Sequence, residues 1–419
     1  MRSGLHKSIK LSATLSSQVE KPELQANSVY QICSVTVLDT TVPGITFNEK
    51  GACHFCDYYD ELAKRTVLRD PALRKAEYET AIRTIKQLGS KKKYDCILGI
   101  SGGMDSTYLA WLAKKEGLRP LLVHFDNGWN SELAVKNIEN IVNILGFDLH
   151  TFVMDWEEFR DLQRAYFEAS VVDVEVPTDQ LIFAALNRIA YQNNIKYILA
   201  GNNVVCESIN PDGWVYKRKL DLVNLRDIHA KYGQLKLRKL PRLGIIQRYF
   251  YEAVAGLQTV NLLDLIDYNK AEVKKLIEKE LNWRDYGGKH YESVFTRFYQ
   301  GYYLPTKFNI DKRKAHLSNL ILSKQITREE ALTILQTPTY PEKDQKSDLR
   351  YVIKKLGFSE SEWEAIMSKP PVDHQFFKTE NDFSTQAFYF VFRALMYVPV
   401  RLLRWVGLLS QTPKIGSQW

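Results

Sequence analysis

The hexapeptide Ser-Gly-Gly-Met-Asp-Ser at residues 101–106 is the part of the sequence best suited to chemistry. It follows the apolar run CILGI at residues 96–100 and precedes an amphipathic run. A strand, a tight turn and a helix start in this order aim several backbone N–H groups at one place, which suits an anion such as phosphate. We therefore predict a nucleotide phosphate site in this loop.

Each residue of the loop has a chemical role in such a site. Gly102 and Gly103 allow close approach of the backbone to phosphate and permit positive φ. Ser101 and Ser106 offer hydroxyl donors, and Asp105 is placed to hold Mg²⁺ between phosphate oxygens. The loop lacks the lysine of G-x-x-x-x-G-K-[ST] and does not match G-x-G-x-x-G, so neither of those nucleotide sites is predicted. A plain tight turn is the alternative interpretation.

The surrounding sequence predicts an α/β fold in which a parallel twisted sheet carries helices on both faces, because short apolar runs alternate with amphipathic ones after residue 94. The predicted strands are residues 96–100, 121–125, 149–154 and 197–200. Gly117 and Gly146 are suited to end two of the intervening helices. Asp126 comes at the carboxyl end of the second strand, where open α/β sheets bind their ligands.

The composition is that of a globular chain long enough for two or three units. Of its 419 residues, 45% are hydrophobic and 12% aromatic, so most of the length is expected to pack. The predicted units are a disordered leader (1–30), an N-terminal cysteine-containing module with a helix (31–92), the α/β domain (93–235), a helical substrate-binding region (236–375) and an amphipathic C-terminal tail (376–419).

Charge and cysteine content restrict the partners and the compartment. The net charge of +8, from 57 basic and 49 acidic residues, mildly favours anionic partners without indicating nucleic acid. The five cysteines are an odd number, and the N-terminus has no apolar signal segment. We therefore expect a cytoplasmic protein with reduced thiols and no nucleic-acid partner.

Residues 386–410 form the most apolar stretch of the chain. Arg393, Arg401 and Arg404 fall within about 80° of one another on a helix, which leaves a broad apolar face. This pattern predicts either a helix lying in the interface of the inner membrane or a helix docked on the protein's own core or on a partner. Pro399 would kink both versions.

Several longer blocks resemble a known family. SGGMDS after an apolar strand resembles the PP-loop of the ATP pyrophosphatase superfamily, which is similar in fold to the adenine-nucleotide hydrolases and cleaves ATP to AMP and pyrophosphate. Over roughly residues 30–340 the chain resembles the N-acetyl sugar amidotransferases of bacterial surface-polysaccharide (lipopolysaccharide and O-antigen) biosynthesis. The blocks that carry this resemblance are DTTVPGITFNEKGACHFC, VPTDQLIFAALNRIA, YILAGNN, WRDYGGKHYESVFTRFYQGYYLPTKFNIDKRKAHLSNLIL and TREEAL.

The resemblance implies an ATP- and Mg²⁺-dependent reaction on a nucleotide-linked N-acetyl sugar. The acetamido oxygen would be adenylated and then replaced by ammonia, which gives an acetamidino group. Such chemistry needs stabilisation of charge around phosphate more than a protein nucleophile.

The resemblance also assigns roles to residues of this chain. Nucleotide binding falls to Ser101, Gly102, Gly103, Asp105, Ser106, Asp126, Gly201, Asn202 and Asn203. Catalytic roles fall to Asp105, Lys312 and Arg313. Sugar-nucleotide binding falls to Thr178, Asp179, Lys289, His290, Tyr291, Glu292 and Arg297. Helix capping by Thr178 and Asp179, a solvated face at residues 312–313 and a core helix at 287–303 are the structural alternatives.

A fused glutaminase is not indicated. Its catalytic cysteine would stand next to the start or on a nucleophile elbow, yet residue 2 is Arg and Cys206 has no flanking elbow glycines. Ammonia is expected from a separate glutaminase, of the kind that resembles imidazole glycerol phosphate synthase.

The cysteines Cys53 and Cys56 have the C-x-x-C spacing of a zinc site, and Cys33 lies upstream. Family members have a second C-x-x-C there, whereas this chain has Thr36 at the fourth position. The predicted site is either three cysteines with water or a substitute such as His54 or Asp39, or a set of buried thiols without metal.

Two other functions compete with the amidotransferase. A tRNA-thiolating enzyme would share the loop and the paired cysteines, but it calls for a strongly basic surface and a reactive cysteine, for which Cys206 is the only candidate. A scaffold without catalysis, anchored at the membrane by its tail, is the third hypothesis. ATP-dependent release of pyrophosphate separates it from both enzymes.

Overall fold

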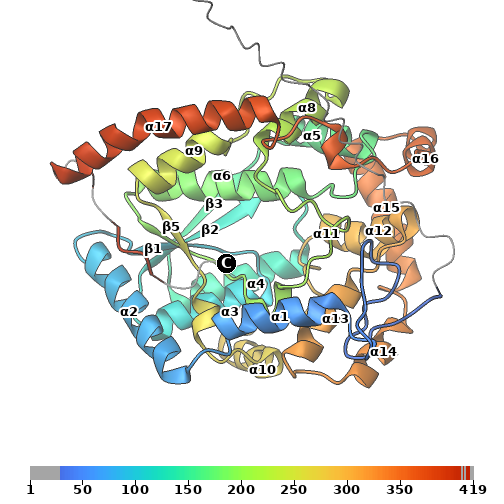
Figure 1. Cartoon of the computed structure of the whole chain (residues 1–419), viewed down its shortest axis with the longest axis horizontal. Coiled ribbons are helices and arrows are strands. Elements are labelled where there is room, and N and C mark those ends of the chain that lie inside the picture. Colours follow the sequence, from blue (N-terminus) through green and yellow to red (C-terminus); the bar gives the residue numbers. More distant parts are fainter. Residues whose placement is uncertain (1–28, 407–408, 410–411, 416–419) are drawn as a thin grey trace, which may run out of the picture.

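A computed structural model describes residues 29–406, 409 and 412–415. The predicted leader therefore lies almost entirely outside the described residues. A five-stranded parallel sheet of order β3-β2-β1-β4-β5 forms the centre of the molecule (Figure 1). Its strands are β1 Cys96–Gly99, β2 Pro120–Asp126, β3 Leu149–Val153, β4 Tyr197–Leu199 and β5 Gln258–Val260.

Helices cover both faces of the sheet, which confirms the predicted α/β class (Figure 1). On one face Leu98 and Leu122 pack with Leu109 of the helix after β1, and on the other Ile97 and Ile198 pack with residues of α6. The alternation along each strand thus supplies two cores. The helices of this part are α2 Pro71–Gly89, α3 Met104–Lys115, α4 Glu132–Leu145, α5 Trp156–Glu168, α6 Val176–Gln192, α7 Val204–Glu207, α8 Leu222–Tyr232 and α9 Ile245–Tyr249.

The sheet extends past residue 235, beyond which the sequence predicted a helical region alone. β5 pairs with β4 from Tyr197↔Gln258 to Leu199↔Val260. A strand of three residues is too short to produce an alternating pattern, and only Val260 of the three is buried. The fifth strand is therefore determined by its pairing with β4 and not by a local sequence pattern.

The rest of the chain after β5 is helical and packs against both the sheet domain and the N-terminal module. A large aromatic cluster joins these parts and includes Phe159, Phe167, Phe295 and Trp363. The helices outside the sheet domain are α1 His54–Arg65, α10 Lys270–Leu281, α11 Val294–Phe298, α12 Leu304–Phe308, α13 Arg313–Leu322, α14 Arg328–Leu335, α15 Glu342–Leu356, α16 Glu360–Ser368 and α17 Phe383–Trp405, with short π or 3₁₀ turns at Phe250–Val254, Leu262–Leu265, Tyr299–Tyr303 and His374–Phe376.

Candidate active site

The loop between β1 and α3 is held in a fixed shape. The Gly103 N–H donates to Ser101 Oγ at 3.1 Å, and no side chain caps α3. Gly102 has φ +78°, and a Cβ there would lie 2.6 Å from the Ala134 carbonyl oxygen of α4. Only glycine fits at this point. The uncapped start of α3 leaves the geometry that a phosphate group requires.

Residues from after β5 complete this loop. The Trp283 indole N–H donates to the Gly102 carbonyl at 2.9 Å. The hydroxyl of Tyr268 donates to Asp105, and the Tyr286 hydroxyl accepts from the Met104 N–H at 3.3 Å. The second region therefore orients the carboxylate of Asp105 and one wall of the loop.

A cluster of paired charges lies beside Asp105. The Lys289 Nζ is 2.9 Å from Glu207 Oε1, and His290 Nε2 is 3.5 Å from the same oxygen. Burial would raise the pKa of Glu207, but the charge of Lys289 and the hydrogen bond with His290 hold it well below its usual range. Burial would lower the pKa of His290, but bonds with Glu207 and Glu292 raise it to about 9.

Two adjoining cavities meet at the phosphate loop. The smaller, about 550 Å³, is lined by Gly103, Asp105, Ser106 and Lys289 among others. The larger, about 1580 Å³, covers the carboxyl ends of β1, β2 and β4. Six residues line both cavities: Ser101, Gly201, Asn202, Glu207, His290 and Glu292.

The larger cavity has its own group of buried charges. The Lys219 Nζ lies 2.7 Å from Asp173 Oδ2 and 2.9 Å from Asp179 Oδ2. Burial and the charge of Lys219 lower the pKa of Lys312, which lines the same cavity. Burial and the charge of Asp179 raise the pKa of Glu175. Buried groups with shifted pKa values in a cavity are typical of functional sites.

Thr178 and Asp179 do not cap α6. The residue before the helix is Glu175, which makes no side-chain capping bond, and Pro177 stands in the first turn. The Thr178 Oγ1 is buried without a hydrogen-bond partner among the described residues, and it belongs to a residue that lines the larger cavity. A buried hydroxyl without a partner fits a position that contacts a ligand.

Besides Gly102, whose carbonyl accepts from Trp283, five residues predicted to bind nucleotide or sugar or to act in catalysis line neither cavity, and each has a structural partner. The Asp126 carboxylate accepts from the Gly128 N–H, and the Asn203 side chain caps α7. Arg297 forms a two-bond ion pair with Asp348, and Arg313 binds Asp311 and three backbone carbonyls. The Tyr291 hydroxyl donates to the Thr339 carbonyl. The residues concerned are Asp126, Asn203, Tyr291, Arg297 and Arg313.

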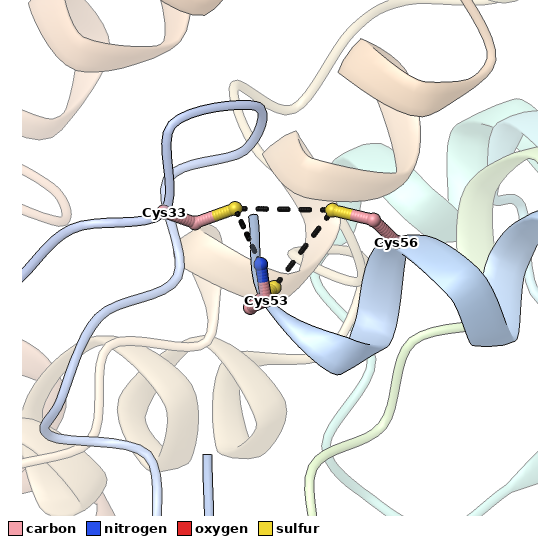
Figure 2. Close-up of side chains that lie close together, drawn as sticks. All are labelled: Cys33, Cys53 and Cys56. Carbon is pink, nitrogen blue, oxygen red and sulfur yellow. Dashed lines mark hydrogen bonds between the residues drawn. The ribbon is translucent and has the colours of Figure 1, made fainter. Parts of the chain in front are cut away.

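The cysteines Cys33, Cys53 and Cys56 converge on one point (Figure 2). The Cys56 Sγ lies 3.8 Å from Cys33 Sγ and 3.9 Å from Cys53 Sγ, and all three residues are buried and free of disulfides. Thiolates that share one zinc ion at 2.3 Å in tetrahedral geometry stand about 3.8 Å apart. The cluster thus has the spacing of a mononuclear metal site.

A buried hydroxyl lies beside one of the three thiols. The Thr36 Oγ1 lies 3.8 Å from Cys53 Sγ and is buried. The two substitutes considered from the sequence are engaged elsewhere, because Asp39 pairs with Lys314 and His54 Nδ1 bonds to Thr46.

Comparisons with known families agree with this geometry. Residues 95–213 match the family model described as queuosine biosynthesis protein QueC, a PP-loop family. Residues 292–391 match the model described as LPS biosynthesis protein WbpG-like, C-terminal domain. Together the two matches support a PP-loop superfamily protein of the WbpG-like type. The first match includes the phosphate loop and Glu207, and the second begins at Glu292, so Lys289 and His290 of the charged cluster lie between the two matched regions.

Individual relatives are more distant. An uncharacterised protein of Methanocaldococcus jannaschii, MJ1599, is 24% identical over 64% of this chain and 80% of its own length. A probable tRNA sulfurtransferase of Natranaerobius thermophilus is 29% identical over 26% of this chain and 28% of that protein. A 7-cyano-7-deazaguanine synthase of Campylobacter jejuni is 32% identical over 28% of this chain and 54% of that protein.

Proposed function

We propose that the protein is an ATP-dependent amidotransferase that converts the acetamido group of a nucleotide-linked N-acetyl sugar into an acetamidino group. The observation that carries this proposal is the pair of cavities that meet at the phosphate loop, about 550 and 1580 Å³. Single ligand sites commonly occupy about 300–1,000 Å³, so there is room for ATP and for a second large substrate. The WbpG-like match supports a sugar substrate.

The reaction balances without a protein nucleophile. The acetamido oxygen attacks the α-phosphorus of ATP, pyrophosphate leaves, and an adenylated imidate forms. Ammonia then adds to the imidate carbon, and AMP leaves with the original oxygen. An amide oxygen is a poor leaving group, and adenylation removes this obstacle.

The residues of the site divide these tasks between them. The loop from Ser101 to Ser106 holds the phosphates through backbone N–H groups and hydroxyls. Mg²⁺, when bound at the carboxylate of Asp105, neutralises charge on the phosphate oxygens. Lys289 supplies positive charge beside Asp105, with its Nζ 3.8 Å from Oδ2. Glu175, whose pKa is raised, is suited to accept the proton that the attacking ammonia releases.

Ammonia would come from a separate glutaminase, of the imidazole glycerol phosphate synthase type. All five cysteines are buried, and burial raises the pKa of Cys206 to about 12. A thiol of this kind is a weak nucleophile, so it suits neither a glutaminase nor the catalytic cysteine of a tRNA-thiolating enzyme. Free cysteines and a nucleotide-linked substrate favour a cytoplasmic location.

Structural zinc is part of the proposal. The donor set fits a mononuclear site in which Cys33, Cys53 and Cys56 would supply three thiolates and water would take the fourth position, beside the Thr36 hydroxyl. Arg328 ties the cluster to α14, because its Nε donates to the Cys33 and Thr36 carbonyls at 3.1 and 3.0 Å. Metal analysis of the purified protein is expected to return one zinc per chain, with loss of zinc and lower stability in Cys56→Ser. Absence of zinc from the intact protein would refute this part.

The test of the function is pyrophosphate release from ATP with ammonium and a panel of nucleotide-linked N-acetyl sugars, compared with tRNA plus a sulfur donor. We expect release that depends on one sugar and is lost in Asp105→Asn. Asp126→Asn is the matched control, because Asp126 lines neither cavity, and it should retain activity. Release with tRNA alone would favour thiolation, and no release with any substrate would favour the scaffold.

A further inference from the structure

The helix α17 carries an apolar stripe that faces away from the protein. Phe388, Val391, Leu395, Val398 and Leu402 recur every three or four residues and are each 54 to 70% exposed. None of the helices in the described residues is long and apolar enough to cross a bilayer. Exposed apolar surface of this extent on a folded protein indicates an interaction site.

The inner side of the same helix is fixed to the sheet domain. Val400 is buried, and the Phe392 ring lies 5.4 Å from the Tyr249 ring of α9. The two helices lie side by side at one edge of the molecule (Figure 1). Ile246 of α9 and Phe250, directly after it, are 41% and 37% exposed, so they add apolar surface next to α17.

Both ends of α17 are tied down. Before the helix, Glu380 pairs with Arg248. After it, the Pro413 carbonyl accepts from the Tyr197 hydroxyl at 2.8 Å, and Ile415 is buried in the core beside the sheet. The helix α17 is therefore an integral part of the fold. Its exposed stripe cannot turn inward without breaking these contacts.

The charge of this segment indicates which kind of partner binds the apolar stripe of α17. Residues 383–419 contain three Arg, one Lys and no Asp or Glu. Arg393 and Arg401 are exposed, and Arg401, three residues after Val398, flanks the stripe. A second copy packed on this helix would bring arginines toward arginines, which is unfavourable. An anionic lipid surface buries the stripe, pairs with Arg401 at its edge and attracts the net positive charge of this segment.

We propose that α17 and α9 form a membrane-docking surface that holds the protein on an anionic bilayer. This inference does not rest on the reaction assigned to the cavities. The family match to the WbpG-like domain ends at residue 391, so most of the stripe lies beyond the matched region. Docking through α17 places the protein at the membrane surface without a spanning helix.

The experiment is co-sedimentation of the full chain with vesicles of neutral phosphatidylcholine, with and without anionic phosphatidylglycerol. Binding is expected to require the anionic lipid and to weaken with added salt. The double variant Leu395→Asp/Leu402→Asp should bind at least about tenfold more weakly, because two apolar side chains no longer enter the interface.

A matched control separates docking from general surface effects. Leu68→Asp/Leu73→Asp places the same change at two leucines that are 67% and 61% exposed away from α17, and it should bind like the wild type. Failure of the wild type to bind anionic vesicles would overturn the proposal. A lipid-free dimer that Leu395→Asp/Leu402→Asp converts to monomer would assign the stripe to a second copy and also overturn it.

Discussion

The ion pair between Lys289 and Glu207 allows a quantitative test of the site. Its two charged atoms are 2.9 Å apart, and the side chains are 12% and 17% exposed. Replacing Lys289 with Met keeps the length of the side chain and removes its charge. The carboxylate of Glu207 then remains buried with His290 as its nearest cation, at 3.5 Å.

The expected cost follows from this geometry. Breaking a buried ion pair by removing one partner costs about 3–5 kcal/mol, because the other charge stays buried without compensation. His290 retains part of the stabilisation, so we expect about 3 kcal/mol for Lys289→Met, at the lower end of that range. The double variant Lys289→Met/Glu207→Gln should cost less than the sum of the single variants by at least about 1.5 kcal/mol.

The assay is urea unfolding of wild type, both single variants and the double variant without ATP. Unfolding without nucleotide measures the ion pair apart from any role in phosphate binding. Arg297→Met, which breaks a pair outside the cavities, is a control that should be additive with Glu207→Gln within about 0.5 kcal/mol. If Lys289→Met and Glu207→Gln are also additive, the charges are not coupled, and the reasoning about the site is refuted.

Three further predictions concern single positions. Lys312→Met should abolish pyrophosphate release without loss of stability, because burial already disfavours the charge of Lys312. Arg313→Met should instead lose about 1–3 kcal/mol of unfolding free energy and keep the KM of the wild type. The reverse pattern would exchange the roles of the two residues. Gly102→Ala should lower the unfolding free energy by at least about 1 kcal/mol and abolish the rise in Tm that ATP causes. A rise in Tm equal to that of the wild type would contradict the loop geometry. The pKa of His290 in the folded protein is about 9, above its ordinary 6.5, so its contribution to stability is full below about pH 6.5 and is lost as pH rises through about 9. Because the side chain is 40% exposed, His290→Gln should lower the unfolding free energy in urea by about 1–2 kcal/mol at pH 6 and by little at pH 10. An equal loss at both pH values would contradict the ion pair.

Much of the fold could be predicted from local pattern. Four strands and the helices after the first two were predicted correctly because buried parallel strands are apolar runs, and Gly117 and Gly146 both adopt positive φ after helices. β5 was missed because its three residues carry no pattern and its pairing with β4 is a tertiary feature. The tail was predicted as either an interfacial or a docked helix, and α17 is docked on one side and exposed on the other.

The site was predictable where a motif carries the chemistry. The loop and Lys289 were identified from contiguous blocks, and they lie together in the structure. Glu207 and Lys219 were missed because neither belongs to a motif that the sequence analysis singled out, and only folding brings each to its partner. Arg313 was assigned to the site with its neighbour Lys312, but Asp311 and backbone carbonyls bind its side chain, which a charge pattern alone does not reveal.

The most direct test of the central claim follows the acetamido oxygen. A nucleotide-linked N-acetyl sugar labelled with ¹⁸O in that carbonyl is incubated with the protein, ATP and ammonium, and the products are analysed by mass spectrometry. We predict that ¹⁸O appears in the phosphate of AMP and that the sugar loses O and gains NH. Retention of ¹⁸O in the sugar, or its absence from AMP, would contradict adenylation of the acetamido group.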